Sequence, residues 1–298
     1  MTDRMKGIPR RPWMDESGMT SRLYGILGHP LAHSLSPAMQ NAAFAAAGID
    51  ALYVPIAVSP DRIRAALRGL KFSGFSGFNV TVPYKQTVLP FLDRVSPSAR
   101  AAGAVNTIVA DPKTGRWTGH NTDVYGFLEL LVRARISFAG KRILLLGAGG
   151  AARAVLSAIA SRSGSIMIRN RTPLRAVRLR ALQPSPIRQK IHIIRNDANL
   201  AASGPFDLII NSTSVGLKSR DRLDLPSHVF DGAGAAVDLI YNPAVTPFIR
   251  AARRAGYHAV NGVDMLLHQG ARAFELWTRR PAPVAAMRRA LMENLKRA

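Results

Sequence analysis

The chain has 298 residues, 47% of them hydrophobic, which is enough for one large or two ordinary folded domains and argues against a disordered protein. It has no cysteine, which excludes disulfides, a thiolate nucleophile and a cysteine-bound metal, and this agrees with a reducing, cytoplasmic location. Its 41 Lys and Arg residues against 18 Asp and Glu give a net charge of +23. A nucleic-acid-binding protein is one source of such a charge, but the basic residues are spread along the chain without a known nucleic-acid motif. We favour a solvated basic surface that attracts anionic small molecules and binds no specific nucleic acid.

Residues 1–19 carry basic side chains but no apolar core, so we expect a disordered tail rather than a secretory signal. The most apolar stretch, residues 143–160, is interrupted by glycines and Arg153. It therefore predicts a strand and a helix rather than a membrane span. The sequence leaves a monomer and a homodimer both open.

The first hundred residues alternate strand and helix patterns, which predicts a mostly parallel α/β sheet. A strand at 23–27 precedes a helix that Ser36 caps and Pro37 opens. A strand at 51–58 and a helix at 59–70 follow. The hydroxyls of Ser34 and Ser36 can both face a small anion beside the first helix, although capping alone also explains Ser36.

Residues 78–85 predict a strand that runs through a proline turn into a helix. Asn79 and Thr81 alternate with valines and so share one face of the strand. Lys85 would begin the helix, where a cation opposes the helix dipole, and this unfavourable place hints at function. A merely solvated lysine is the alternative.

A strand after Asn106 and a hairpin turn at 111–115 lead to the sequence Gly-His-Asn-Thr-Asp, which ends at Asp123. An apolar helix is predicted at 124–132, so Asp123 is either functional or only the helix cap. The histidines are few and lack ligand spacing, so we expect no metal site.

Residues 141–155 predict a strand, a tight turn and a helix in the form G-x-G-x-x-A. Gly147 permits the turn, Gly149 lets the backbone approach a pyrophosphate, and Ala152 lets the helix pack on the strand. The helix N-terminus then offers N–H groups to the pyrophosphate. A purely structural glycine turn is the alternative.

The next strand, 165–170, ends without the carboxylate that binds a free ribose 2′-hydroxyl. It is followed instead by Asn170, Arg171 and Thr172, with Arg175 one turn later. Two guanidiniums suit a 2′-phosphate, which predicts NADP as cofactor. Two solvated arginines are the alternative.

A strand that ends in small polar residues is predicted within 208–216, and a strand and turn within 236–243. A helix from 263 to Trp277 and an amphipathic helix at 284–296 follow. Taken alone, Tyr241 is a packed aromatic and Gln269 a polar residue on a helix face. A loop is expected at 183–186.

From about Leu23 onward, the chain resembles the shikimate dehydrogenase family. The motifs that carry the resemblance occur in the family's order and are G-H-P-L-A-H-S-L-S-P, N-V-T-V-P-Y-K, A-G-A-V-N-T, G-H-N-T-D, G-A-G-G-A-A-R and N-R-T. The resemblance implies NADPH-dependent reduction of 3-dehydroshikimate to shikimate in chorismate and aromatic amino acid biosynthesis. A quinate/shikimate or aminoshikimate-type dehydrogenase is the alternative within the class, and a basic nucleic-acid-binding protein on the same scaffold is the alternative outside it.

The resemblance also implies roles for single residues. Lys85 and Asp123 are expected to be catalytic, and Ser34 and Ser36 to hold the substrate carboxylate. The other expected substrate-binding residues, beside Asp123, are Asn79, Thr81, Asn106, Tyr241 and Gln269. The residues expected to bind NADP(H) are Gly147, Ala148, Gly149, Gly150, Ala151, Asn170, Arg171, Thr172, Arg175, Thr213, Ser214, Leu239 and Gly262.

Two α/β domains are expected from the same reasoning. Residues 20–122 and 263–298 form the substrate-binding domain, with a mostly parallel sheet, and residues 123–262 form a Rossmann-like NADP-binding domain. The chain crosses between them at Asp123 and Gly262, so the substrate is expected in the cleft between the domains.

Overall fold

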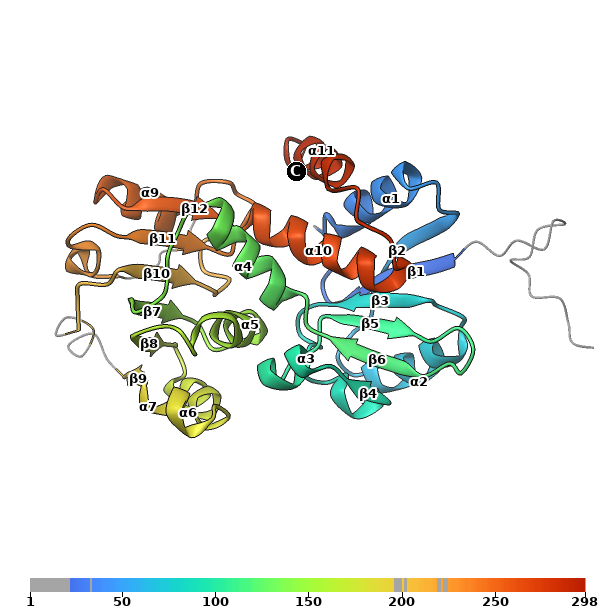
Figure 1. The fold of residues 1–298 in the computed structure, drawn as a ribbon, viewed down its shortest axis with the longest axis horizontal. Coiled ribbons are helices and arrows are strands. Elements are labelled where there is room, and N and C mark those ends of the chain that lie inside the picture. Colours follow the sequence, from blue (N-terminus) through green and yellow to red (C-terminus); the bar gives the residue numbers. More distant parts are fainter. Residues whose placement is uncertain are drawn as a thin grey trace, which may run out of the picture.

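The computed structural model describes residues 22–32, 34–195, 200, 203–218, 221 and 225–297. Two six-stranded sheets lie side by side along the long axis of the molecule (Figure 1). The expected tail at 1–19 lies outside the described residues. Within them, two separate α/β layers confirm the predicted fold class.

The first sheet has the order β2-β1-β3-β5-β6-β4. Its strands are β1 (Arg22–Gly28), β2 (Ala51–Ala57), β3 (Gly77–Val80), β4 (Arg94–Val95), β5 (Thr107–Ala110) and β6 (Trp117–His120). It is parallel along β2, β1 and β3, and antiparallel where β5 and β6 enter as the predicted hairpin. Polar strand ends therefore meet at one edge of the parallel part, beside the connection to the second sheet.

The helical elements of the first half are α1 (Ser36–Ala46), α2 (Ile63–Phe72), the 3₁₀ helix η1 (Leu89–Phe91) and α3 (Pro97–Ala102). The helix predicted at Lys85 is wrong. Residues 82–88 form turns, because the carbonyl of Lys85 accepts the N–H of Val105 at 2.8 Å instead of a helical N–H. The helix predicted from residue 59 begins only at Ile63.

The predicted cap at Ser36 is also wrong. Leu35 already has helical φ and ψ of −88° and −4° and takes the cap position, so Ser36 is the first helical residue. Its side chain caps no backbone N–H. The hydroxyl of Ser36 is therefore available for other contacts, and the capping alternative loses its support.

The second sheet is parallel throughout, in the order β12-β11-β10-β7-β8-β9, which is the order of a doubly wound dinucleotide-binding sheet. Its strands are β7 (Arg142–Leu146), β8 (Ser165–Arg169), β9 (Ile191–Ile194), β10 (Leu208–Asn211), β11 (Ala235–Asp238) and β12 (His258–Asn261). The order reverses between β7 and β10, and ligands bind at such a switch point.

The second half of the described chain contains the helices α4 (Asp123–Arg133), α5 (Gly150–Ile159), α6 (Pro173–Ala181), α7 (Ser185–Gln189), the 3₁₀ helix η2 (Ser227–Phe230), α9 (Pro247–Arg254), α10 (Val263–Thr278) and α11 (Val284–Leu295). The loop expected at 183–186 is only partly correct, because α7 begins at Ser185. None of the helices in the described ranges combines the length and the apolar composition that a bilayer crossing requires.

Helices α4 and α10 pack against each other and run from one sheet to the other (Figure 1). They can approach closely because residue 126 is glycine: a Cβ there would lie 2.6 Å from the Met265 carbonyl oxygen and 2.8 Å from Gln269 Cβ. This contact fixes the first residues of α4 beside the middle of α10. It therefore places Asp123 and Gln269 in one site.

Candidate active site

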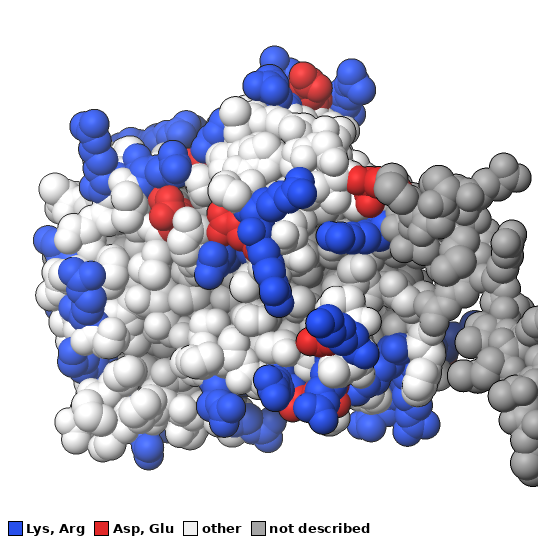
Figure 2. Space-filling view, turned by 45° about the vertical axis from the view of Figure 1, so that its right-hand side comes forward, with Lys and Arg blue, Asp and Glu red and all other residues white. Residues whose placement is uncertain are grey.

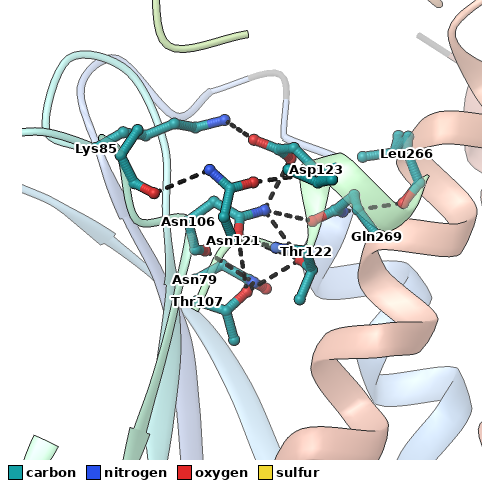
Figure 3. A network of polar contacts seen from close by, with 11 residues as sticks. Asn79, Lys85, Asn106, Thr107, Asn121, Thr122, Asp123, Leu266 and Gln269 are labelled. Carbon is teal, nitrogen blue, oxygen red and sulfur yellow. Dashed lines mark hydrogen bonds and ion pairs between the residues drawn. The ribbon is translucent and has the colours of Figure 1, made fainter. Parts of the chain in front are cut away.

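Lys85 and Asp123 form an ion pair where the two sheets meet (Figure 3). Lys85 Nζ donates to Asp123 Oδ2 at 2.6 Å, and the two side chains are 15% and 7% exposed. Asp123 is not a helix cap, because Thr122 occupies that position. Its carboxylate can therefore pair with the Lys85 ammonium, which is largely shielded from water.

Asn106 connects this pair to helix α10. Its Nδ2 donates to Asp123 Oδ1 at 2.8 Å and lies 3.3 Å from Gln269 Oε1, while its Oδ1 accepts the backbone N–H of Thr122 at 2.7 Å. Both ends of the Asn106 amide are therefore occupied, which fixes the rotation of the Asp123 carboxylate. Gln269 is fixed at its other end, since Nε2 donates to the Leu266 carbonyl at 2.9 Å.

Asn79 extends the network toward the outer strands of the first sheet. Its Nδ2 donates to Thr107 Oγ1 at 3.0 Å and to the Asn106 carbonyl at 3.1 Å, and its Oδ1 accepts from the Tyr53 hydroxyl at 2.7 Å. Sequence reasoning missed Tyr53. The available signal was its place on an alternating strand, but an inward aromatic on a strand is usually only packed.

Burial raises the pKa of the Tyr53 phenol, and the Ser36 hydroxyl nearby opposes this rise. Ser34 is half-buried just before α1, and Thr81 packs its methyl group against Gly28. The structure therefore brings Asn79, Asn106 and Gln269 into one hydrogen-bonded set with the Lys85–Asp123 pair, and Ser36 lies near this set. Ser34 and Thr81 lie close in sequence to members of this set but outside its hydrogen bonds among the described residues.

The turn after β7 has the geometry that a dinucleotide-binding turn requires. Gly147 has φ of +107°, and a Cβ there would lie 2.6 Å from Ser212 Oγ. Gly149 is the N-cap of α5, so no side chain occupies the first N–H groups of that helix. Around Gly149, no atom lies within 4 Å of where a Cβ would stand. The turn and the helix N-terminus can therefore receive a pyrophosphate.

The same turn touches the ion pair. A Cβ on Gly150 would lie 3.2 Å from Lys85 Cδ, so the lysine stem packs directly on the first residue of α5. A cofactor bound along this turn would therefore lie next to Lys85. Ala148 and Ala151, the other residues expected to contact the cofactor here, belong to the same short segment.

The segment after β8 is exposed. Arg171, Thr172 and Arg175 face solvent, and Asn170 Nδ2 donates to the Thr172 carbonyl at 2.9 Å. Pro173 is the first residue of α6. Two guanidiniums thus stand at the end of the second strand of the nucleotide fold, where a ribose 2′-substituent would lie.

The strand ends on the other side of β7 carry the remaining predicted residues. Gly262 is pressed against the carbonyl of Leu239, because a Cβ would lie only 2.2 Å from that oxygen. Thr213 donates its hydroxyl to Asn211 Oδ1 at 2.7 Å, while Ser214 is exposed. Burial raises the pKa of Tyr241, which packs against the apolar core that β1, β2 and α1 share with α10 and α11.

Asp238 is a fully buried carboxyl at the end of β11, held by Asn211, Thr246 and the backbone N–H of Ile240. Burial raises its pKa from the ordinary range to about 6 despite these three donors. The folded protein therefore binds a proton here between about pH 4 and 6, where the unfolded chain does not.

From this shift we expect Asp238 to lower the free energy of unfolding by about 2–3 kcal/mol as pH rises from about 4 to 6. Carboxyls with lowered pKa, such as that of Asp207, change stability in the opposite direction. Urea unfolding of the wild type and of Asp238→Asn across pH 4–8 separates the two effects. The free energy of unfolding of the wild type, minus that of Asp238→Asn, should fall as the pH rises to about 6. A difference that does not change with pH would show that Asp238 does not cause the loss of stability.

Among the described residues, no group of three or more His, Asp or Glu side chains stands close enough together to hold a metal ion. The groups that the site itself offers are the ion pair and the amides and hydroxyls around it. Amide and hydroxyl groups recognise a polyhydroxylated ring, and an ammonium–carboxylate pair can hold and move a proton.

Comparison with known proteins identifies the family. A family model described as the shikimate dehydrogenase substrate binding domain matches residues 26–108, and one described as the shikimate 5'-dehydrogenase C-terminal domain matches residues 262–292. A shikimate dehydrogenase (NADP(+)) from Moorella thermoacetica is 47% identical over 281 residues, which cover 92% of this chain and 93% of the relative.

The chain belongs to the shikimate dehydrogenase family.

Solved structures share the fold over nearly the whole length of the chain. The shikimate 5-dehydrogenase of Thermus thermophilus in complex with NADP(H) and shikimate has a TM-score of 0.80 and 36% identity, covering 92% of this chain and 99% of that one. A ligand-free 5-ketofructose reductase from a Gluconobacter strain has a TM-score of 0.75 and 33% identity, covering 93% and 99%. The predicted family is confirmed, and the second similarity means that the substrate must be tested directly.

Proposed function

We propose that this chain catalyses the reversible NADPH-dependent reduction of 3-dehydroshikimate to shikimate. The observation that carries the proposal is the Lys85–Asp123 pair, 2.6 Å apart and packed against Gly150 of the nucleotide-binding turn. At this point a proton-holding group and the cofactor turn meet. The family relationship supports the same substrate, since its relatives are shikimate dehydrogenases.

The contacts around the pair support a separate role for each of Lys85, Asp123 and Asn106. The ammonium of Lys85 donates a hydrogen bond to the ketone oxygen and stabilises the negative charge that grows there. Asp123 holds Lys85 in place, and the two together supply or relay the proton that the alkoxide needs. Asn106 keeps the Asp123 carboxylate in one rotation, so this arrangement exists before the substrate arrives.

The polar groups on both sides of the Lys85–Asp123 pair are proposed to recognise the substrate. Asn79, Thr81, Asn106 and Gln269 are proposed to bind ring oxygens, and Tyr241 to close the same space. Ser34 and Ser36, at the N-terminus of α1, are proposed to hold the carboxylate. A ring held at both ends cannot slide away from Lys85.

The residues present fit NADP(H). The open turn at Gly149, the uncapped α5 N-terminus and the close contact of Gly262 with Leu239 leave backbone, rather than side chains, facing the cofactor path. The hydride that reduces the ketone carbon comes from the bound cofactor. Thr213 and Ser214 are proposed to line the cofactor path from β10, and Arg171 and Arg175 to bind the 2′-phosphate.

The wider assignments are consistent with this proposal. Residues 20–122 with 263–298 would form the substrate-binding domain, and residues 123–262 the cofactor domain. We propose a cytoplasmic enzyme, either monomeric or homodimeric.

The deciding experiment assays the purified protein with shikimate and with quinate, each with NADP and with NAD. The proposal predicts NADP-linked oxidation of shikimate as the fastest of the four reactions. Faster oxidation of quinate would favour the quinate/shikimate alternative, and no activity on either acid would contradict the proposed function.

A nucleic-acid-binding function receives little support from the charge distribution. On the face shown in Figure 2, Lys and Arg stand in small separate groups, several of them beside Asp or Glu, with uncharged surface between them. A phosphate-binding protein would lose affinity for random DNA steeply as salt rises. We expect weak binding to random DNA, without the affinity of a dedicated site, in a salt titration followed by fluorescence anisotropy.

Replacing either serine should weaken substrate binding without affecting the cofactor. A hydrogen bond to a charged group contributes about 1.5–3 kcal/mol, so Ser34→Ala and Ser36→Ala should each raise the KM for shikimate by roughly tenfold or more. The KM for NADP should hardly change. Because Ser36 caps no backbone group, a lowered melting temperature with unchanged KM would contradict its proposed role.

A further inference from the structure

Asn211 and Asp238 form a buried hydrogen-bonded pair that takes no part in the proposed proton transfer. They are the last residues of the neighbouring strands β10 and β11, lie opposite each other in the register, and are both 0% exposed. Asn211 Nδ2 donates to Asp238 Oδ1 at 2.9 Å. Burying a carboxyl costs stability, and burial raises the pKa of Asp238 to about 6. An apolar side chain would avoid this cost, but it could accept no hydrogen bond.

The side-chain amide of Asn211 organises the loop that follows β10. Its Oδ1 accepts from the N–H of Thr213 at 3.1 Å and from the Thr213 hydroxyl at 2.7 Å. Its Nδ2 also donates to the Val215 carbonyl at 3.2 Å, and the N–H of Val215 donates to Thr213 Oγ1 at 3.1 Å. Both partners of Nδ2 can only accept and both partners of Oδ1 can donate, so the orientation of the amide is determined. Residues 212–215 are therefore folded around Asn211.

The same pair holds the loop that follows β11. Asp238 Oδ1 accepts the N–H of Ile240 at 3.1 Å, and the carbonyl of Asn211 accepts the N–H of Leu239 at 2.9 Å. Asp238 Oδ2 accepts from the hydroxyl of Thr246, which is the N-cap of α9. Asn211 and Asp238 thus connect two neighbouring loops at the carboxyl edge of the second sheet.

Both loops carry residues that the proposed function assigns to the cofactor. Thr213 and Ser214 belong to the loop after β10, and Leu239 begins the loop after β11. Strand β10 lies beside β7, where the strand order reverses and a dinucleotide would cross the sheet. Because Asn211 and Asp238 are fully buried, they can act on a cofactor only through these loops.

We propose that Asn211 and Asp238 are a positioning pair, which holds loops 212–215 and 239–241 in the conformation that receives the half of NADP(H) remote from its 2′-phosphate. The inference rests on the proposed function, which places Thr213, Ser214 and Leu239 on the cofactor path. All donors and acceptors of the pair belong to the protein, so the loops are ordered by the fold itself. Ordering them in advance lowers the entropy cost of binding the cofactor.

The first test compares alanine with asparagine at position 238 in the full-length protein. Asp238→Ala removes both oxygens, whereas Asp238→Asn removes the charge but keeps an oxygen that can accept from Asn211 and Ile240. Asp207 is the matched control, because it accepts the N–H of Arg142 at 2.8 Å but lies at the opposite edge of the same sheet, directly before β10. The same two substitutions at Asp207 measure the loss of a strand-binding carboxylate away from the loops.

Asp238→Ala and Asn211→Ala should each raise the Kd for NADPH by about threefold to tenfold or more, the effect of at least one net hydrogen bond. Asp238→Asn should recover most of this affinity, and Asp207→Ala should stay within about twofold of the wild type. The affected loops lie away from the 2′-phosphate, so NADP and NAD should lose the same factor in kcat/KM. Titration by the fluorescence of NADPH measures the Kd without a substrate.

Hydrogen exchange tests the pair in the wild type, and therefore does not depend on the folding of a variant. The N–H groups of Thr213, Val215 and Ile240 lie in loops but donate to the pair or to the Thr213 hydroxyl that the pair holds. They should exchange slowly in the protein without NADPH, as slowly as the strand ends beside them. Exchange at the rate of an open loop would contradict the proposal.

The proposal would also be overturned by an unchanged Kd in folded Asp238→Ala or Asn211→Ala, by an equal rise in Asp207→Ala, or by an equal rise in Asp238→Asn. A wild type that binds NADPH but oxidises neither shikimate nor quinate would instead contradict the proposed function. The Kd and the hydrogen exchange would still decide the role of the pair, so the two failures are distinguishable.

Discussion

Lys85→Ala is expected to lower kcat by about a hundredfold or more, with a smaller change in the KM for shikimate. Removing a positioned acid–base group typically costs a factor of about 10²–10⁴ in rate. We expect the loss in kcat because the charge that Lys85 is proposed to stabilise develops only in the transition state. Steady-state assays at saturating NADP and varied shikimate measure both constants.

A matched control is the Lys71–Asp93 ion pair, 2.9 Å apart on the same half of the molecule and more exposed. Lys71→Ala should leave kcat near the wild-type value. Because Lys85→Ala leaves the buried Asp123 carboxylate without its cation, thermal unfolding should be followed in parallel. A folded Lys85→Ala protein with near-normal kcat would remove Lys85 from the chemistry.

The elements defined by short-range patterns were predictable. The turn at Gly147 and Gly149 depends on residues within a few positions of each other, and glycine is the residue type that allows its backbone conformation. The alternation of strand and helix in turn predicts a parallel sheet, because parallel neighbours need a crossover. The order of the second sheet follows the same logic.

Two predictions of local backbone failed, and a distant partner explains one of them. The sequence Tyr84-Lys85-Gln86 is compatible with a helix, but the N–H of Val105 donates to the Lys85 carbonyl and holds the segment in turns. A window of ten residues around Lys85 does not contain Val105. Ser36 before Pro37 has the pattern of a cap, but Leu35 already adopts helical angles.

Within the site, motif resemblance pointed to single residues but not to their connections. Asn106 was expected as a substrate ligand, and its occupied amide shows that it also orients Asp123. Tyr53 carries no motif, and its contact with Asn79 joins residues 26 positions apart on different strands. Such contacts depend on strand order and register, which the sequence alone leaves open.

The second large effect expected concerns cofactor choice and rests on Arg171 and Arg175. A 2′-phosphate carries up to two negative charges, and each guanidinium can bond it, whereas NAD offers only a hydroxyl. One charge-assisted bond contributes about 1.5–3 kcal/mol, and every ~1.4 kcal/mol is a factor of ten. Both arginines are exposed, so we take the low end and do not add them. NADP should exceed NAD by at least about tenfold in kcat/KM.

Arg171→Asp should erase or invert this preference, because a carboxylate repels the phosphate and can accept from a ribose hydroxyl. Arg178→Asp makes the same change of charge on the exposed face of α6, beyond the end of β8, and should keep the preference. The KM for shikimate should hardly move in either variant, since the adenosine end of the cofactor lies far from the reacting carbon. Equal use of NAD and NADP by the wild type would contradict the 2′-phosphate assignment and leave that of Lys85 and Asp123 untouched.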